Sequence, residues 1–137
     1  MQQEVTIRIS GSQTAQGDTH RSEMTTRGRL ERLEDGYVLC YEEGGLAGHP
    51  GPFVIRVDGD VISLLHRDPQ HANLTFFRDR PGINAVQTPY GMLEVEVYPK
   101  RVDSRLDDRG GQLELDYELS CNGNFLSSHN MQVRFYV

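Results

Sequence analysis

The feature that most constrains this chain is a strict alternation of apolar and polar side chains near its C-terminal end. Apolar residues occupy every odd position from Gln112 to Cys121, and polar residues occupy every even one. Successive side chains of a β-strand point to opposite faces, so this pattern predicts a strand with one buried and one solvated face. Beyond Asn122, Gly123 and Asn124 the odd positions again carry apolar residues, namely Phe125, Met131, Val133, Phe135 and Val137. The two segments predict a long antiparallel hairpin.

The same pattern predicts the register of this hairpin. A two-residue loop would pair odd positions with even ones and place half of each apolar face on the wrong side. We therefore expect a three-residue loop of Asn122, Gly123 and Asn124, with a bulge at Gly123 or Asn124. The expected pairs are Cys121 with Phe125, Leu119 with Ser127, Tyr117 with His129, and Leu115 with Met131. Tyr117 and His129 then lie side by side on the inner face.

A second hairpin is predicted around Asp58 and Gly59, because apolar residues alternate on both sides of this turn signal. A two-residue turn there pairs Ile55 with Ile62 and Phe53 with Leu64, and the same face continues to His66. Further strands are expected at 5–10, 22–33, 37–42, 72–77, 84–88 and 92–102, the last one bent or bulged at Pro99. We predict a single all-β domain over residues 1–137. Its architecture is expected to be an antiparallel meander β-barrel of about eight to ten strands, because long strands must coil to close and closure removes exposed edges.

Composition excludes several classes of protein. The chain has 14 Lys and Arg against 20 Asp and Glu, a formal net charge of −6, which argues against a nucleic-acid partner. No apolar stretch approaches the roughly 18–20 residues of a membrane helix, and the N-terminal residues lack the pattern of a secretory signal. We therefore expect a cytoplasmic protein without a membrane partner, whose Cys40 and Cys121 are reduced core thiols. No phosphate-binding glycine loop or paired-cysteine metal motif occurs, and no cofactor is expected.

Several short motifs make the chain resemble the uncharacterised bacterial β-barrel proteins of the YwiB-like type. These motifs are the segment 61–67 leading to Leu74-Thr75-Phe76, then Thr88-Pro89-Tyr90-Gly91 with Leu93, then Tyr117-Glu118-Leu119, and finally the alternating residues 131–135. The chain departs from the family pattern at Asp68-Pro69, Val86 and Ser127. The resemblance implies a calycin-like barrel, lipocalin-like in architecture. It implies no established activity and supplies no catalytic residues.

The candidate site residues fall into three groups. Tyr117 and His129 are polar-tipped side chains expected inside the barrel, where they bond each other, extend their polar ends to the barrel mouth, or line a ligand cavity. Thr88 and Tyr90 belong to the Thr-Pro-Tyr-Gly motif, where Tyr90 either caps the core or lies at the barrel mouth. His66 and Arg67 are expected near a strand end at the mouth. A metal site at His66, Asp68 and His71 is disfavoured, because Asp68-Pro69 breaks the strand between the two histidines.

Three functions remain open at this point. The first is a non-enzymatic barrel that binds a small, apolar ligand near Tyr117, His129 and Tyr90. The second is an interaction module or homodimer that uses its outer face, where Val54, Val61, Leu65 and Phe77 are expected to form one patch. The third and least favoured is an enzyme with a mouth site of His66, Arg67 and Asp68.

Overall fold

The computed structural model describes residues 2–43, 50–66, 73–88 and 91–137, and within these ranges the regular structure consists of strands alone. The ten strands are β1 (Gln2–Ala15), β2 (Asp18–Leu33), β3 (Gly36–Glu43), β4 (Pro50–Asp58), β5 (Val61–His66), β6 (Leu74–Phe77), β7 (Gly82–Thr88), β8 (Gly91–Asp107), β9 (Gly110–Cys121) and β10 (Asn124–Tyr136). None of the described residues forms a helix of the length and apolar character needed to cross a membrane.

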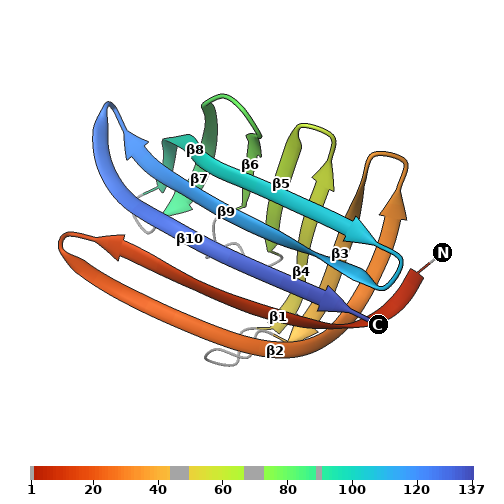
Figure 1. The fold of residues 1–137 in the computed structure, drawn as a ribbon. Helices are drawn as coiled ribbons and strands as arrows, with labels where there is room; N and C mark the ends of the chain where they lie inside the picture. Colours follow the sequence, from red (N-terminus) through yellow and green to blue (C-terminus); the bar gives the residue numbers. More distant parts are fainter. Residues whose placement is uncertain (1, 44–49, 67–72, 89–90) are drawn as a thin grey trace.

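The strands form one antiparallel sheet in the order β6-β5-β4-β3-β2-β1-β10-β9-β8-β7. Strands adjacent in sequence pair with each other except β6 and β7, which are the two edges of the sheet, and the first strand pairs with the last, Ile7 opposite Phe135. The sheet curls until β6 and β7 face each other, so the barrel is nearly closed (Figure 1). The all-β antiparallel barrel predicted from the sequence is confirmed.

The seam between β6 and β7 is bridged by a side chain. The backbone N–H of Thr75 donates to Oδ1 of Asn84 at 2.9 Å, and Nδ2 of Asn84 donates to the carbonyl oxygen of Thr75 at 2.8 Å. The Asn84 carboxamide thus supplies one donor and one acceptor, as the backbone of a paired strand would. This satisfies polar groups that an edge strand would otherwise present to solvent.

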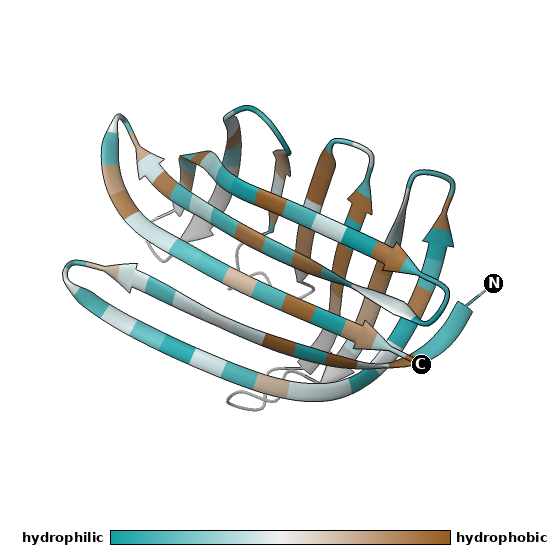
Figure 2. Cartoon of the chain, viewed as in Figure 1, coloured by the Kyte–Doolittle hydropathy of each residue, from teal (hydrophilic) through white to brown (hydrophobic). Residues whose placement is uncertain are grey.

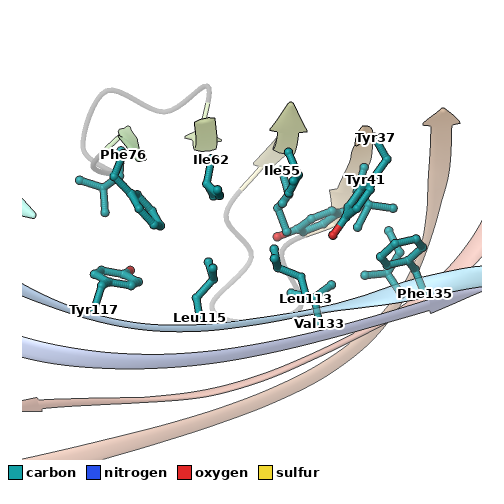
Figure 3. Close-up of a cluster of buried hydrophobic side chains, with 14 of the residues drawn as sticks. Tyr37, Tyr41, Ile55, Ile62, Phe76, Leu113, Leu115, Tyr117, Val133 and Phe135 are labelled. Atoms are coloured by element: carbon teal, nitrogen blue, oxygen red, sulfur yellow. The ribbon is translucent and has the colours of Figure 1, made fainter. Parts of the chain in front are cut away.

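The core lies between two walls of the flattened barrel. Long strands β8, β9, β10 and β1 form one wall, and the shorter strands β3 to β6 form the other (Figure 1). Alternate side chains of both walls point into the space between them, and Tyr37 packs against Phe135 with ring centroids 5.0 Å apart (Figure 3). Tyr37, Phe76, Phe135 and most of their neighbours are almost fully buried, so side chains fill the middle of the barrel. Along the strands, apolar and polar residues alternate as this packing requires (Figure 2).

The hairpin of β9 and β10 confirms most of the expected register and corrects its loop. Leu119 pairs with Ser127, Tyr117 with His129, and Leu115 with Met131, as predicted. The loop is a two-residue turn, however, and Cys121 pairs with Asn124 rather than with Phe125. Asn122 and Gly123 have φ values of 53° and 80°, as in the type I′ turn that matches the twist of paired strands. The extra residue is accommodated in a bulge between Phe125 and Ser127, which restores the inner face.

The hairpin of β4 and β5 needs a similar correction. The turn lies one position later than expected, at Gly59 and Asp60, because Asp58 pairs with Val61. Ile55 therefore pairs with Leu64, and Phe53 with His66, instead of Ile62 and Leu64. Each partner moves by two residues, so the same side chains still face the core. The predicted irregularity at Pro99 is confirmed as a shift in register between Pro99 and Arg101.

Both cysteines are half-buried and form no disulfide. Cys40 pairs with Val54 between the buried residues Leu39 and Tyr41, which places its side chain on the outer face. The expectation of a core thiol is therefore wrong for Cys40. The residues on either side of it, Leu39 and Tyr41, face the core instead.

Candidate functional site: a hollow at one end of the barrel

A row of four polar-tipped side chains crosses the inner face near one end of the barrel. His20 on β2 pairs with Gln13 on β1, Gln13 pairs with His129 on β10, and His129 pairs with Tyr117 on β9. Directly paired residues of antiparallel strands project on the same side of the sheet. The Tyr117–His129 pair predicted from the sequence is therefore half of a longer row.

Gln13 and His20 were not anticipated, because β1 and β2 are longer than the sequence pattern indicates. The two strands continue to Ala15 and from Asp18, around a turn in which Gln16 and Gly17 have φ values of 54° and 84°. The end of this hairpin is mostly polar on both faces, so no apolar alternation marks it (Figure 2). The signal that was available is the Gln-Gly turn between Thr14 and Thr19, since threonine favours strands. These two hydroxyls are 2.9 Å apart in the structure.

The row borders a hollow of about 350 Å³ on this part of the barrel. The next row toward the core contains Ser22, which has a small side chain, and Gly11, which has none, and both border the hollow. Gly11 is required by close packing, because a Cβ atom there would lie 2.7 Å from the carbonyl oxygen of Asn130. The hollow is lined by Ile9, Gly11 and Met131 on its apolar side, and by polar residues that include Gln13, His20, Arg21, Tyr117 and His129.

Tyr117 and His129 form a stacked pair in the wall of the hollow. Their ring centroids lie 4.8 Å apart and their planes differ by 7°, while Phe76 packs on Tyr117 with centroids 5.5 Å apart. Oγ of Ser127 lies 2.8 Å from Nε2 of His129, which holds the imidazole in place. Burial raises the pKa of Tyr117 to about 12 and lowers the pKa of His129. Both rings are therefore held in their uncharged forms near neutral pH.

The contact between Ser127 and His129 does not make a nucleophilic site. Ser127 is buried, with 7% of its surface exposed, and it is not among the residues that line the hollow. Activation of a serine also requires a group that orients the histidine, usually a carboxylate on its other nitrogen. His129 has no such partner among the described residues. The bond is best understood as a support for the stacked pair.

The remaining predicted site residues are described only in part. His66 ends β5 opposite Phe53, and Thr88 ends β7 opposite Gly91, and for both the structure describes the backbone alone. Arg67 and Tyr90 lie outside the described residues, as do Asp68 and His71. Within the described ranges, no three His, Cys, Asp or Glu side chains gather as ligands of a metal ion would.

The four outer apolar residues do not form the single patch that was expected. Val54 pairs with Leu65, and Val61 pairs with Phe77. Between these two pairs runs a polar row in which Arg56 pairs with Ser63 and Ser63 with Thr75. The guanidinium of Arg80 also covers the Phe77 ring, 4.0 Å from its centroid. The apolar surface is thus divided into two small parts.

A larger hollow of about 620 Å³ lies beside the bend of β2. Its residues are already engaged with each other: Arg27 donates to the Thr6 hydroxyl at 2.9 Å and lies 3.6 Å from the carboxylate of Glu4. Tyr41, at its edge, stacks on Phe53 with ring centroids 5.1 Å apart. This hollow is less suited to a ligand than the one at Tyr117 and His129.

The fold and the hollow define a class of protein: an all-β antiparallel barrel with a packed core and a recess at one end. The chain belongs to the family described as Domain of unknown function (DUF1934), which matches residues 7–133. Its fold is similar to the crystal structure of the YwiB protein from Bacillus subtilis, with a TM-score of 0.79 and 18% sequence identity over 98% of this chain and 92% of that one. The resemblance drawn from the sequence motifs is thereby confirmed. No curated protein matches the chain in sequence.

Proposed function

We propose that this protein binds a small molecule, without transforming it, in the hollow beside Tyr117 and His129. The observation that carries the proposal is the hollow itself, which adjoins a buried tyrosine and a half-buried histidine. A volume of about 350 Å³ lies at the lower end of the range typical of ligand sites. Barrels of this general size are widely used to hold one small ligand, which supports the proposal by analogy.

The expected ligand differs from the apolar one inferred from the sequence. The apolar interior is filled by its own side chains, among them Phe76, Tyr37 and Phe135. Polar side chains and the stacked pair of Tyr117 and His129 line much of the hollow, with only Ile9 and Met131 as larger aliphatic groups. Such a lining fits a ligand with a ring and polar substituents better than an alkyl chain.

The test uses the full chain, labelled for two-dimensional ¹H–¹⁵N NMR and titrated with a library of small ring compounds. We expect some compounds to shift the amide signals of Gly11, His129 and Met131 together. A Ser22→Trp variant should abolish these shifts, because Ser22 lines the hollow and is exposed enough to accept an indole. Thr19→Trp is the matched control, since Thr19 is exposed on the opposite face of the same strand.

Two results contradict the proposal. One is a library in which no compound moves the signals of the hollow. The other is a set of shifts that persists unchanged in Ser22→Trp, which would place binding elsewhere. Both Trp variants are first compared with the parent chain by thermal unfolding, so that loss of binding is read only on a folded protein.

A further inference from the structure

A second hollow, of about 400 Å³, opens on the outer face of the wall of long strands, where the turn between β8 and β9 meets the end of β10 (Figure 1). Gly110 borders this space and pairs with Asp107 on one side and with Tyr136 on the other. A residue without a side chain thus lies between two longer ones. Only glycine fits there, because the φ of Gly110 is 150° and a Cβ atom would collide with the carbonyl oxygen of Phe135. We call this space the Gly110 hollow.

Two arginines flank Gln112 in the lining of the Gly110 hollow. Arg105 on β8 and Arg134 on β10 both pair with Gln112 on β9. Directly paired residues project on the same side of a sheet, and this side faces outward because Leu113 and Val133, the next residues along, are buried on the other side. The backbones of the two arginines are two strand spacings apart, roughly 10 Å. A single oxyanion above Gln112 would therefore lie within reach of both guanidinium groups.

Neither of these two arginines is paired with a carboxylate. Across the described ranges of the chain, Arg105 and Arg134 form no ion pair. The acidic residues of the adjacent row, Asp103 and Glu114, both bind Arg101 instead, at 2.6 and 3.4 Å. Their charges are thus directed away from the Gly110 hollow.

The turn between β8 and β9 adds a third arginine and one aspartate to the lining. Arg109 also forms no ion pair with a described residue. Oδ1 of Asp107 accepts the backbone N–H groups of Arg109 and Gly110, at 2.8 and 3.0 Å, so this carboxylate helps to close the turn. Asp108, the other acidic residue of the turn, is not among the lining residues. The hollow is therefore basic, although the whole chain carries 20 acidic residues against 14 basic ones.

We propose that the Gly110 hollow is a second binding site, which takes the phosphate group of a small molecule. Arg105 and Arg134 donate N–H groups to the phosphate oxygens from the two sides of Gln112, because the guanidinium fork matches the geometry of a phosphate. A phosphate monoester carries nearly two negative charges at neutral pH, which suits a lining of three arginines and one aspartate. The ring of Tyr136, which is 45% exposed, gives the organic part of the ligand an apolar surface. The volume has room for both parts.

This site is separate from the hollow beside Tyr117 and His129. Gln112 and Tyr117 lie five positions apart on β9, roughly 17 Å, and they face opposite sides of the sheet. Binding at the two sites is therefore read from different amide signals, and the two proposals can fail independently.

The experiment titrates the labelled full-length chain with phenyl phosphate, inorganic phosphate and phenol at constant ionic strength, read by ¹H–¹⁵N NMR. Phenyl phosphate should shift the amide signals of Gly110, Gln112 and Tyr136, and phenol should not. Arg105→Gln and Arg134→Gln should each weaken binding about fivefold, which is the effect of one exposed charged pair.

Two further variants change the charge of the hollow with little change of shape. Gln112→Glu is nearly isosteric and places a carboxylate between the two arginines, so it should weaken binding about tenfold. Asp107→Asn keeps an acceptor for the N–H groups of the turn and removes a negative charge, so it should strengthen binding about twofold. A gain of this kind cannot arise from a damaged fold.

Arg29→Gln is the matched control, because it removes the same charge from an exposed residue on the outer face of β2, outside the hollow. It should leave binding unchanged, and an effect as large as that of Arg134→Gln would refute the site in favour of overall charge. The proposal is also overturned if neither phosphate compound shifts the Gly110 and Gln112 signals, or if phenol shifts them as strongly. Tighter binding of phenyl phosphate than of inorganic phosphate identifies an organic ester as the ligand, and equal binding identifies the free ion; either result supports a phosphate site.

Discussion

Replacing Asn84 with Ala removes the side chain that closes the barrel. Its carboxamide makes two hydrogen bonds to the backbone of Thr75, at 2.9 and 2.8 Å. A hydrogen bond contributes about 0.5–1.5 kcal/mol net, and both of these are accessible to water after the change, so the expected loss of stability is about 1–2 kcal/mol. An unfolding entropy of about 2.1 cal/mol/K per residue over 137 residues converts this to a fall in Tm of roughly 3–7 °C.

The assay combines thermal unfolding with amide hydrogen exchange read by NMR. Exchange at the Thr75 amide should accelerate selectively in Asn84→Ala, because that N–H loses its acceptor and β6 gains a free edge. Asn84→Asp keeps an acceptor for Thr75 N–H but places a carboxylate against the Thr75 carbonyl, so it should be no more stable than the Ala variant. Gln132→Ala, which removes an exposed amide on the outer face, is the control. An unchanged Tm with unchanged protection of Thr75 in Asn84→Ala would refute the role of Asn84 in closing the seam.

Three further predictions concern the core and the stacked pair. Phe135→Ala should lower the free energy of unfolding in urea by about 3–5 kcal/mol, because Phe135 is 1% exposed. Tyr136→Ala, at the neighbouring and 45% exposed position, should cost far less. Similar losses at both positions would contradict the assigned faces. Tyr37→Phe should lower the free energy of unfolding by about 1 kcal/mol, because it removes the hydroxyl that lies 2.9 Å from the Ser104 hydroxyl. A double-mutant cycle with Ser104→Ala should give a coupling energy of about 0.5–1.5 kcal/mol rather than zero. Burial lowers the pKa of His129 below its ordinary 6.5. As the pH falls, His129 is therefore protonated in the unfolded chain before it is protonated in the folded chain. The free energy of unfolding should decrease as the pH drops below about 6.5. Urea midpoints measured from pH 8 to pH 5 should therefore fall more steeply for the parent chain than for His129→Gln, and parallel slopes would show that His129 is not titrating in this way.

The chain's alternation determines most of the fold. It assigns inner and outer faces along β9 and β10 because side-chain direction in a strand repeats every two residues, whatever the rest of the protein does. It also placed Tyr117 beside His129, which the structure confirms. The errors in the two hairpins left the faces intact, because each correction moved a partner by an even number of residues or added a bulge.

Only the tertiary structure decided where the extra residue of the last hairpin goes. A three-residue loop and a two-residue turn with a bulge both keep Leu119 opposite Ser127. The type I′ geometry of Asn122 and Gly123 matches the twist of the strands, so the irregularity moved to the stretch after Phe125.

The position of the hollow beside Tyr117 could be predicted even less from the sequence, because it depends on how the barrel closes. His20 and Gln13 join Tyr117 and His129 only because β1 pairs with β10, the two ends of the chain. The space beside them arises where Gly11 and Ser22 meet, and the seam closes through Asn84. A period of two residues fixes which way a side chain points, but sheet twist and closure decide which distant strand it meets, and this pairing creates the hollow.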